Sequence, residues 1–274
     1  MTQAKKGHAF RALHARDRAF IIPNPWDAGT ARLLASLGFE ALATTSAGYA
    51  FSAGKRDGTV GREEALAHVS VIVSATDLPV SADLENGFGD AAETVAETIK
   101  LAAQSGLAGG SIEDVCRLDH QVYDIEHAVE RVQAAAEAAR SFEFPFTLTA
   151  RAENYLVGRP DLRDTIKRLR AYEEAGADVL YAPGLSSKED IAAVVSSVGR
   201  PVNVLMGMQG SQLSLAELSA LGVKRVSVGS ALSRAAFGAF LRAAHEMHEH
   251  GTFSFANEAI SYGDINAMFP DSTP

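Results

Sequence analysis

Acidic side chains occur where short apolar segments of the chain end. Asp83 and Glu85 close the segment that begins after Pro79, and Glu113 follows the segment that begins after Gly106. Residues two apart on an extended strand point to the same side, so Asp83 and Glu85 should face a space that Glu113 can reach from a neighbouring strand. Three close carboxylates stay ionised only with a cation among them, and an all-oxygen set favours a hard ion such as magnesium.

A basic residue ends another such segment. Arg151 follows the apolar run after Pro145, and a guanidinium there can hold a carboxylate or phosphate through two parallel hydrogen bonds. The alternative for Arg151 is a buried ion pair with Glu153 or Glu113. The acids have an alternative too, because acids at strand ends can cap helices or form surface ion pairs. Asp114 faces away from Glu113 and is expected to be structural.

Small polar residues could position a substrate. Thr45, Ser46, Ala47 and Gly48 offer hydroxyls and approachable backbone N–H groups, which could cradle a carboxylate or phosphoryl oxygen. An ordinary small turn has the same composition. Asn203 could donate a hydrogen bond to the substrate, or it could be a satisfied asparagine inside a barrel.

The elements that would position these residues are marked by glycine and proline. Four apolar segments follow a glycine that suits the left-handed end of a helix. Three others begin after a proline, which is tolerated at the first position of a strand. With one segment near the start, eight strands are predicted: 19–23, 39–45, 80–83, 107–112, 146–151, 177–181, 202–205 and 223–228.

Helical periodicity fills the intervals between the strands. The predicted helices are 28–37, 62–75, 91–104, 125–140, 162–174, 188–197 and 214–221. Strands that alternate with helices are typical of a parallel sheet, and eight strands close a barrel. An open doubly wound sheet is the alternative, but no Gly-x-Gly-x-x-Gly turn follows the first strand. The sequence therefore predicts an α/β fold, a (β/α)8 TIM-type barrel with its site at the strands' C-terminal ends.

Composition narrows the function classes. The 274 residues are 47% hydrophobic and 22% charged, which suits one large globular core. The net charge of −9 disfavours a nucleic-acid binder. No apolar run approaches the roughly 18 residues that span a bilayer, so no membrane partner is expected. The single cysteine, Cys116, fits a reducing compartment, and a cytoplasmic location is expected.

Taken in order along the chain, these motifs resemble the isocitrate lyase and phosphoenolpyruvate mutase superfamily. The resemblance extends from about Phe10 to Leu241. Its most specific part is the Asp-x-Glu-x-Gly-Phe-Gly stretch at 83–89. The supporting parts are Asn-Pro-Trp-Asp at 24–27, Thr-Ser-Ala-Gly at 45–48, Ser-Ile-Glu-Asp at 111–114 and Ala-Arg-x-Glu at 150–153.

The resemblance implies a magnesium ion, with manganese as a substitute, and a small α-keto or 2-hydroxy acid substrate. It implies that Asp83 binds the metal directly. It also implies that Asp57, Glu85 and Glu113 act mostly through metal-bound water. Arg151 would hold a substrate carboxylate or phosphonate together with the turn at Ser46. Trp26 and Asp27, at the end of the first strand, are expected to contact the substrate as well.

The resemblance also implies an oligomer in which subunits exchange a C-terminal helix. Residues 1–248 are expected to form the barrel and residues 249–274 an oligomerisation extension. This extension carries the apolar residues Phe253, Phe255, Ala259, Ile260 and Tyr262, and apolar surface of that kind tends to be covered. A dimer of helix-swapped dimers is the expected assembly.

The segment after the fourth strand departs from the family pattern. It lacks the Lys-Lys-Cys-Gly-His or Lys-Arg-Cys-Gly-His motif of the carbon–carbon lyases and the Asn- and Lys-bearing loop of the phosphonate mutases. Cys116 therefore does not inherit a catalytic role, and a buried free cysteine is the default. His120, Tyr123 and Arg159 could carry protons or serve packing. The segments 51–58 and 116–122 are expected to form lids.

These observations predict a magnesium-dependent lyase or decarboxylase. It would cleave a carbon–carbon bond of a small oxo- or hydroxy-dicarboxylate through an enolate, with Arg151, Asp57 and Glu113 as catalytic residues. The first alternative is phosphorus–carbon chemistry on phosphoenolpyruvate or phosphonopyruvate through the same enolate. The second alternative is a barrel that binds a ligand without turnover.

Overall fold

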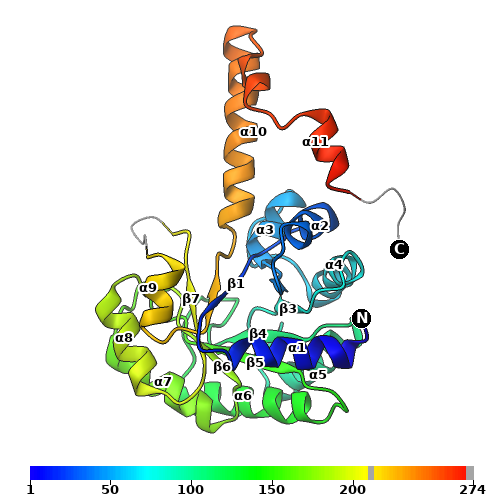
Figure 1. Ribbon diagram of the computed structural model, residues 1–274. Helices are drawn as coiled ribbons and strands as arrows, with labels where there is room; N and C mark the ends of the chain where they lie inside the picture. The colour runs from blue at the N-terminus through cyan, green and yellow to red at the C-terminus, as the bar shows by residue number, and fades with distance from the viewer. Residues whose placement is uncertain (209–212, 270–274) are drawn as a thin grey trace.

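Eight parallel strands form the centre of the computed structural model, which describes residues 1–208 and 213–269 (Figure 1). The strands are β1 (Phe20–Ile22), β2 (Leu42–Ala43), β3 (Val80–Asp83), β4 (Gly109–Glu113), β5 (Thr147–Arg151), β6 (Val179–Tyr181), β7 (Val202–Leu205) and β8 (Arg225–Ser227). They pair in the order β1-β8-β7-β6-β5-β4-β3-β2. The Ala43 N–H donates to the Pro23 carbonyl at 3.0 Å, which links the two edges. The predicted TIM-type barrel is confirmed.

Helices alternate with the strands around the barrel. They are α1 (Gln3–His14), α2 (Ala28–Ser36), α3 (Ser46–Ser52), α4 (Arg62–Ser74), α5 (Ala92–Gln104), α6 (Ile125–Arg140), α7 (Leu162–Glu174), α8 (Lys188–Ser197), α9 (Leu215–Ala220) and α10 (Ala231–His250). The seven helices predicted between strands are found within two residues of their predicted ends. The glycines Gly106 and Gly222 follow helices with φ of 87° each, as predicted for a left-handed helix end.

Helix α3 lies in a segment for which the sequence predicted no helix. It begins where a small turn was expected and continues into the expected lid segment 51–58. The Thr45 hydroxyl caps it by accepting a hydrogen bond from the Gly48 N–H at 3.2 Å. The turn at 45–48 is therefore the first turn of a short helix.

Alternate strand residues face the helices and the barrel interior. On β5, Leu148 and Ala150 belong to the apolar core, whereas Thr149 and Arg151 reach the interior. This alternation places polar side chains inside the barrel. At the end of the barrel where the strands begin, Phe10 of α1 packs edge to face with Phe20. The Phe10 side chain is fully buried.

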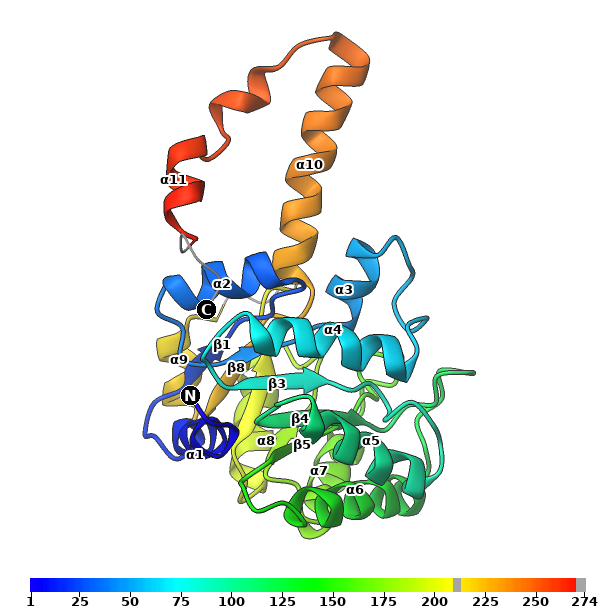
Figure 2. The ribbon, with the colours of Figure 1, turned by 90° about the vertical axis from the view of Figure 1, so that its right-hand side faces the viewer.

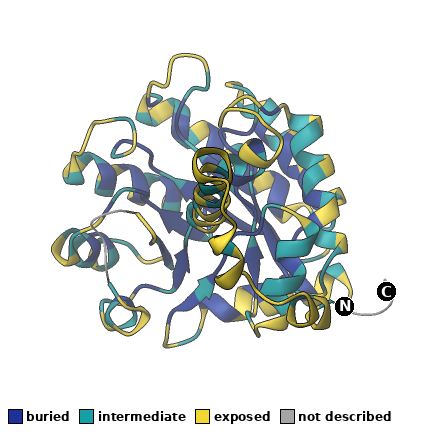
Figure 3. Ribbon diagram, turned by 90° about the horizontal axis from the view of Figure 1, so that it is seen from above, coloured by how far each residue is buried: buried dark blue, intermediate teal, exposed yellow. Residues whose placement is uncertain are grey.

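The C-terminal segment leaves the barrel. Figures 1 and 2 show α10 projecting away from the end at which the strands finish, followed by a return through a 3-10 turn (Ser254–Asn257) to α11 (Tyr262–Ala267). Viewed along α10, its surface is mostly exposed above the buried strands (Figure 3). Phe240, Phe253 and Tyr262 are 67%, 66% and 84% exposed. The residues 270–274 of the predicted extension lie outside the described residues.

Two further observations concern this segment. The Glu246 carboxylate accepts hydrogen bonds from the hydroxyls of Thr252 and Ser254, both at 2.8 Å, which anchors the return of the chain along α10. None of the helices in the described ranges is both long enough and apolar enough to cross a membrane.

Candidate active site

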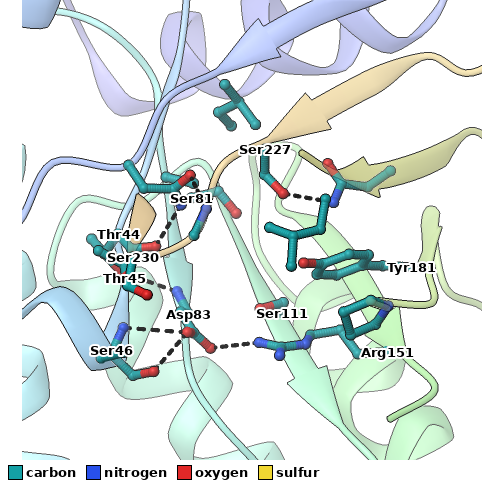
Figure 4. Close-up of a pocket in the computed structure, with 18 of the residues that line it drawn as sticks. Thr44, Thr45, Ser46, Ser81, Asp83, Ser111, Arg151, Tyr181, Ser227 and Ser230 are labelled. Carbon is teal, nitrogen blue, oxygen red and sulfur yellow. Dashed lines mark hydrogen bonds and ion pairs between the residues drawn. The ribbon is translucent and has the colours of Figure 1, made fainter. Parts of the chain in front are cut away.

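A pocket of about 150 Å³ lies at the C-terminal end of the barrel and extends into its interior (Figure 4). Residues from all eight strands or the turns after them contribute to its wall. The polar ones are Asn24, Thr44, Thr45, Ser46, Asp57, Ser81, Asp83, Ser111, Arg151, Tyr181, Asn203, Arg225, Ser227 and Ser230. The pocket therefore suits a small polar ligand.

Asp83 is the last residue of β3 and lies between a cation and a helix start. Its Oδ1 accepts a hydrogen bond from Arg151 Nη1 at 2.9 Å. Its Oδ2 accepts from the Ser46 hydroxyl at 2.9 Å and from the Ser46 N–H at 3.3 Å. Figure 4 shows these three groups together on one wall of the pocket.

Arg151, the last residue of β5, is surrounded by carboxylates. Its Nε donates to Glu153 at 2.7 Å, and its Nη2 lies 3.2 Å from a Glu113 oxygen, in addition to the contact with Asp83. The predicted alternative of a buried ion pair thus holds for Glu153 and Glu113 together. The Tyr181 ring lies 5.2 Å from the guanidinium carbon, a cation–π distance. Burial lowers the pKa of Arg151, but these carboxylates raise it well above its usual range.

The acids at this end outnumber the cations. Burial raises the pKa of Glu113 well above its usual range, although the charge of Arg151 opposes the rise. Burial, and then the charge of Asp83, raises the pKa of Glu85 to about 7. The same two causes raise the pKa of Asp57, which lines the pocket from the segment between α3 and α4. A cation beside these groups would offset their repulsion.

Glu85 does not occupy the position that strand alternation predicted. Strand β3 ends at Asp83, and Glu85 has a φ of 49°, so the two residues are not on one extended strand. Glu85 does not line the pocket; its carboxylate pairs instead with Arg117 Nε at 2.8 Å. Glu113 does not line the pocket either, and it pairs with Arg151.

Asp83, Glu85 and Glu113 therefore do not face the pocket together, contrary to what the positions at the strand ends predicted. Within residues 1–208 and 213–269, no group of three or more His, Cys, Asp or Glu side chains is arranged to hold a metal ion. Of the predicted metal residues, Asp83 alone lines the pocket, with Asp57 as a second lining carboxylate. This arrangement is compatible with one direct ligand and further acids that act through water.

The residues predicted to contact substrate divide into two groups. Thr45, Ser46, Ala47 and Asn203 line the pocket. Gly48, Trp26 and Asp27 do not.

Each residue outside the pocket has another role or position. Asp27 caps α2 by accepting the Thr30 N–H at 2.7 Å, and the Trp26 carbonyl contacts His68 Nε2 at 2.8 Å. Helix capping is the alternative role for acids at strand ends, and Asp27 has this role.

The loop after β4 also lies outside the pocket wall. The Cys116 N–H donates to the Gln121 carbonyl at 2.9 Å, within a short hairpin closed by a bridge between Val115 and Val122. Cys116 is partly exposed, not fully buried as predicted by default. His120, Arg159 and Tyr123 lie outside the pocket wall as well.

Two neighbours of this loop are structural. The Tyr123 hydroxyl accepts a hydrogen bond from Asn86 Nδ2 at 3.0 Å. Asp114 pairs with Arg168 at 3.1 Å and accepts the Glu153 N–H at 2.8 Å, so the expected structural role of Asp114 agrees with its contacts.

Two arginines were not singled out from the sequence. Arg117 donates to the carbonyls of Gly58 and Val60 at 2.6 and 2.8 Å and pairs with Glu85, so it joins the two expected lid segments to the β3 loop. Arg225 lines the pocket from β8. The available signal for Arg225 was the alternation Arg225-Val226-Ser227, which puts the arginine and serine on the interior face of a strand.

Comparison with known proteins agrees with this fold and site. The family model described as phosphoenolpyruvate phosphomutase matches residues 10–248. A solved structure from Burkholderia cenocepacia J2315, provisionally assigned as a lyase or mutase, is 65% identical with a TM-score of 0.94, covering 97% of this chain and 95% of its own.

Two characterised relatives are more distant. The 2,3-dimethylmalate lyase of Eubacterium barkeri is 28% identical over 77% of this chain and 75% of its own length. The structure of oxaloacetate acetylhydrolase in complex with the inhibitor 3,3-difluorooxalacetate is 26% identical with a TM-score of 0.85, covering 97% and 93%. Because the family model spans most of the barrel, the chain belongs to the phosphoenolpyruvate phosphomutase family, within the PEP mutase/isocitrate lyase superfamily, whose members include enzymes named lyases.

Proposed function

We propose that this chain is a divalent-metal-dependent lyase or decarboxylase that cleaves a carbon–carbon bond of a small oxo- or hydroxy-dicarboxylate. The observation that carries the proposal is the pocket wall at which Asp83, Arg151 and Ser46 meet. The lyase and hydrolase names of the two characterised relatives support carbon–carbon cleavage.

The donor set fits a hard cation such as magnesium or manganese. Among the described residues, five carboxylates interact with two arginines, Arg151 and Arg117; they are those of Asp57, Asp83, Glu85, Glu113 and Glu153. The excess negative charge and the all-oxygen chemistry favour such an ion. Asp83 would hold it directly, with Asp57, Glu85 and Glu113 around it. A bound ion would supply positive charge to the substrate oxygens.

The residues of the chain act on the substrate carboxylate and on the charge that develops. With a 2-oxo acid, the bond from C3 to the leaving group breaks and its electron pair stays on the 2-oxo acid fragment as an enolate. With a 2-hydroxy acid, the hydroxyl proton is removed, the C2–C3 bond breaks, C2 becomes the keto carbon, and the electron pair stays at C3 of the other carboxylate fragment as its enolate. Arg151 stabilises the developing negative charge, and Asp83 and Glu113 fix the guanidinium in place. A proton added to C3 then completes the reaction. Asp57, which lines the pocket and has a raised pKa, is the proposed proton carrier.

One alternative chemistry has specific support. The family model is named for phosphoenolpyruvate phosphomutase, and the same enolate would form if the bond between carbon and phosphorus broke. Arg151 would then stabilise the same charge. Turnover therefore has to be measured with both classes of substrate.

The test is proton and phosphorus NMR of the protein with magnesium and a panel of substrates. The panel contains oxaloacetate, methylisocitrate, isocitrate, phosphoenolpyruvate and phosphonopyruvate. Loss of a carbon–carbon bond in the wild type but not in Asp83→Asn supports the proposal. Magnesium-dependent binding of pyruvate without turnover of any compound would instead indicate a barrel that only binds ligands.

The assembly is proposed from the exposed arm, defined as α10 and the residues after it up to 269. Its apolar side chains, including Phe240, Phe253 and Tyr262, are exposed, and exchange of the arm between subunits would cover them. A dimer of such dimers is proposed. Truncation after His248 should lower the number of subunits per assembly, as measured by light scattering. An unchanged number of subunits would show that the residues after 248 do not hold subunits together.

A further inference from the structure

Arg225 is a buried cation that has no carboxylate partner in the described part of the chain. It is the first residue of β8, lines the pocket and is 5% exposed. Among the described residues, no Asp or Glu forms an ion pair with it. Arg151, which lines the same pocket, and the buried Arg168 each pair with carboxylates.

Three neutral groups hold the Arg225 guanidinium in place. Its Nε donates to Asn203 Oδ1 at 2.9 Å and its Nη2 to Thr149 Oγ1 at 3.0 Å. Its Nη1 lies 3.4 Å from Nε2 of His14. The Phe10 carbonyl lies 2.9 Å from His14 Nδ1, which assigns the proton to Nδ1 and leaves Nε2 as an acceptor.

The His14 ring is neutral and so does not change the charge around Arg225. Burial, and then the charge of Arg225, lowers the pKa of His14 to about 3, so the ring is neutral at neutral pH. A guanidinium has five N–H donors, and these contacts use three of them. The remaining two have no acceptor among the residues that the structure describes. Burial lowers the pKa of Arg225 to about 10, so the side chain keeps its charge.

Arg225 lies deeper in the barrel than Arg151. Strands β8 and β5 are not neighbours in the sheet, so the hydrogen bond from Arg225 to Thr149 crosses the interior. Thr149 precedes Arg151 by two residues on β5, which is about 7 Å along a strand. Both arginines line the same pocket. The pocket thus has one cation near its mouth, Arg151, and one deeper in the barrel, Arg225. Of these two, Arg151 is neutralised by carboxylates, whereas no carboxylate among the described residues neutralises Arg225.

We propose that Arg225 binds the second carboxylate of a dicarboxylate substrate at the floor of the pocket, with Asn203 and Thr149 holding its guanidinium in position. A buried charge without a counterion is costly, because burial disfavours the charged form. A ligand carboxylate that reaches the two unused N–H groups supplies the counterion and forms charge-assisted hydrogen bonds. The inference rests on the proposed function, because it defines the substrate class of the same pocket.

The test compares two ligands that differ only at the distal group. Malate and 2-hydroxybutyrate have the same four-carbon chain and the same 2-hydroxy acid end, but malate has a carboxylate where 2-hydroxybutyrate has a methyl group. Calorimetry with magnesium present should show that the wild type binds malate at least tenfold more tightly. This measurement needs no variant, so it tests the proposal even if substitution of the buried arginine impairs folding.

Variants locate the preference. Arg225→Gln should bring malate affinity to within about threefold of that for 2-hydroxybutyrate and leave 2-hydroxybutyrate affinity nearly unchanged, because hydrogen bonds to a charged group contribute roughly tenfold or more. Arg225→Lys should retain part of the preference, since it keeps the charge but loses the fork. The control is Arg163→Gln, an exposed arginine on α7 outside this pocket, which should keep the wild-type preference.

The outcomes separate the two proposals. Equal magnesium-dependent binding of both ligands by the wild type, or a full malate preference in a folded Arg225→Gln variant, would overturn the role of Arg225 and leave the proposed lyase function standing. Absence of binding by both ligands to the wild type would overturn both. A preference that disappears only in Arg225→Gln supports the assignment.

Discussion

The two arginines that line the pocket have opposite surroundings. Arg151 contacts Asp83, Glu113 and Glu153, so its charge is balanced before any ligand arrives. Among the described residues, the Arg225 guanidinium hydrogen-bonds to Asn203 and Thr149 and lies beside His14, and no carboxylate there balances its charge. Both guanidinium groups make several contacts, which are ionic for Arg151 and neutral for Arg225.

This difference shows how one barrel can separate chemistry from recognition. The carboxylates around Arg151 create a region of excess negative charge, which suits a cation and a reaction that develops charge. The neutral groups around Arg225 leave an unpaired positive charge, which suits an anionic part of a ligand. A net charge of −9 for the chain makes such a local cation necessary for attracting an anion.

The largest expected effect tests the acidic side of this comparison. Asp83→Ala should abolish magnesium dependence and lower kcat/KM by about a thousandfold or more, because the proposed direct ligand is lost. Glu85→Gln is the matched control, since its carboxylate pairs with Arg117 and does not line the pocket, and it should leave weakened magnesium binding. Calorimetry that finds unchanged magnesium affinity in Asp83→Ala would place the ion elsewhere.

The next largest effect concerns the geometry of Arg151. Arg151→Lys keeps a positive charge but cannot contact Asp83, Glu113 and Glu153 through one planar fork. We expect kcat/KM to fall at least a hundredfold, or about 3 kcal/mol. The same conservative substitution at Arg225 should mainly raise KM. If Arg151→Lys is fully active, a positive charge at position 151 is sufficient and the planar fork of Arg151 is not needed. The proposed difference in role between Arg151 and Arg225 would then lose its support.

The fold was predictable because it rests on local signals. Gly106 and Gly222 mark helix ends, and helix periodicity places α5, α6 and α7 to within a residue or two. Helix α3 was not predictable in this way, because its first turn consists of small polar residues that also form loops. Its start depends on the capping hydroxyl of Thr45.

The site was predictable in part. Asp83 and Arg151 end their strands, so the rule that barrel sites lie at strand ends identified them. The bounds of β3 were predicted correctly, but Glu85 was assumed to continue the extended backbone beyond Asp83, and a φ of 49° cannot be read from residue type alone. Arg225 was missed because its contact with Thr149 joins strands that are distant in the sequence and in the sheet.

A smaller effect comes from the titration of Glu85. Its pKa is raised to about 7, so the folded protein binds more protons than the unfolded chain between pH 4.5 and 7, and this group lowers the free energy of unfolding as pH rises through that window. His14 acts in the opposite direction, because its pKa is lowered. The measurement is therefore a difference between wild type and Glu85→Gln, in which the contribution of His14 cancels.

Urea unfolding of the metal-free proteins at pH 4.5 and 7.5 gives that difference. Between pH 4.5 and 7.5, the free energy of unfolding of Glu85→Gln should rise by about 2 to 3 kcal/mol relative to that of the wild type. This value follows from the shift of the Glu85 pKa from 4.5 to about 7. If the free energies of unfolding of the two proteins change equally with pH, Arg117 keeps Glu85 ionised over the whole range. The repulsion among the carboxylates near the pocket would then be weaker than their contacts indicate.

The smallest expected effect tests whether chemistry also extends to the loop after β4. Cys116 is partly exposed and lies outside the pocket wall, in a hairpin that lacks the lyase motif. A general acid or base contributes about two to four orders of magnitude in rate, so Cys116→Ser should cost less than about tenfold in kcat/KM if the thiol has no such role. Measured beside Arg151→Lys, a severe loss in Cys116→Ser with a healthy Arg151→Lys would reverse the assignment. The loop would then have to close over the pocket during turnover, and the thiol, not Arg151, would carry the decisive step.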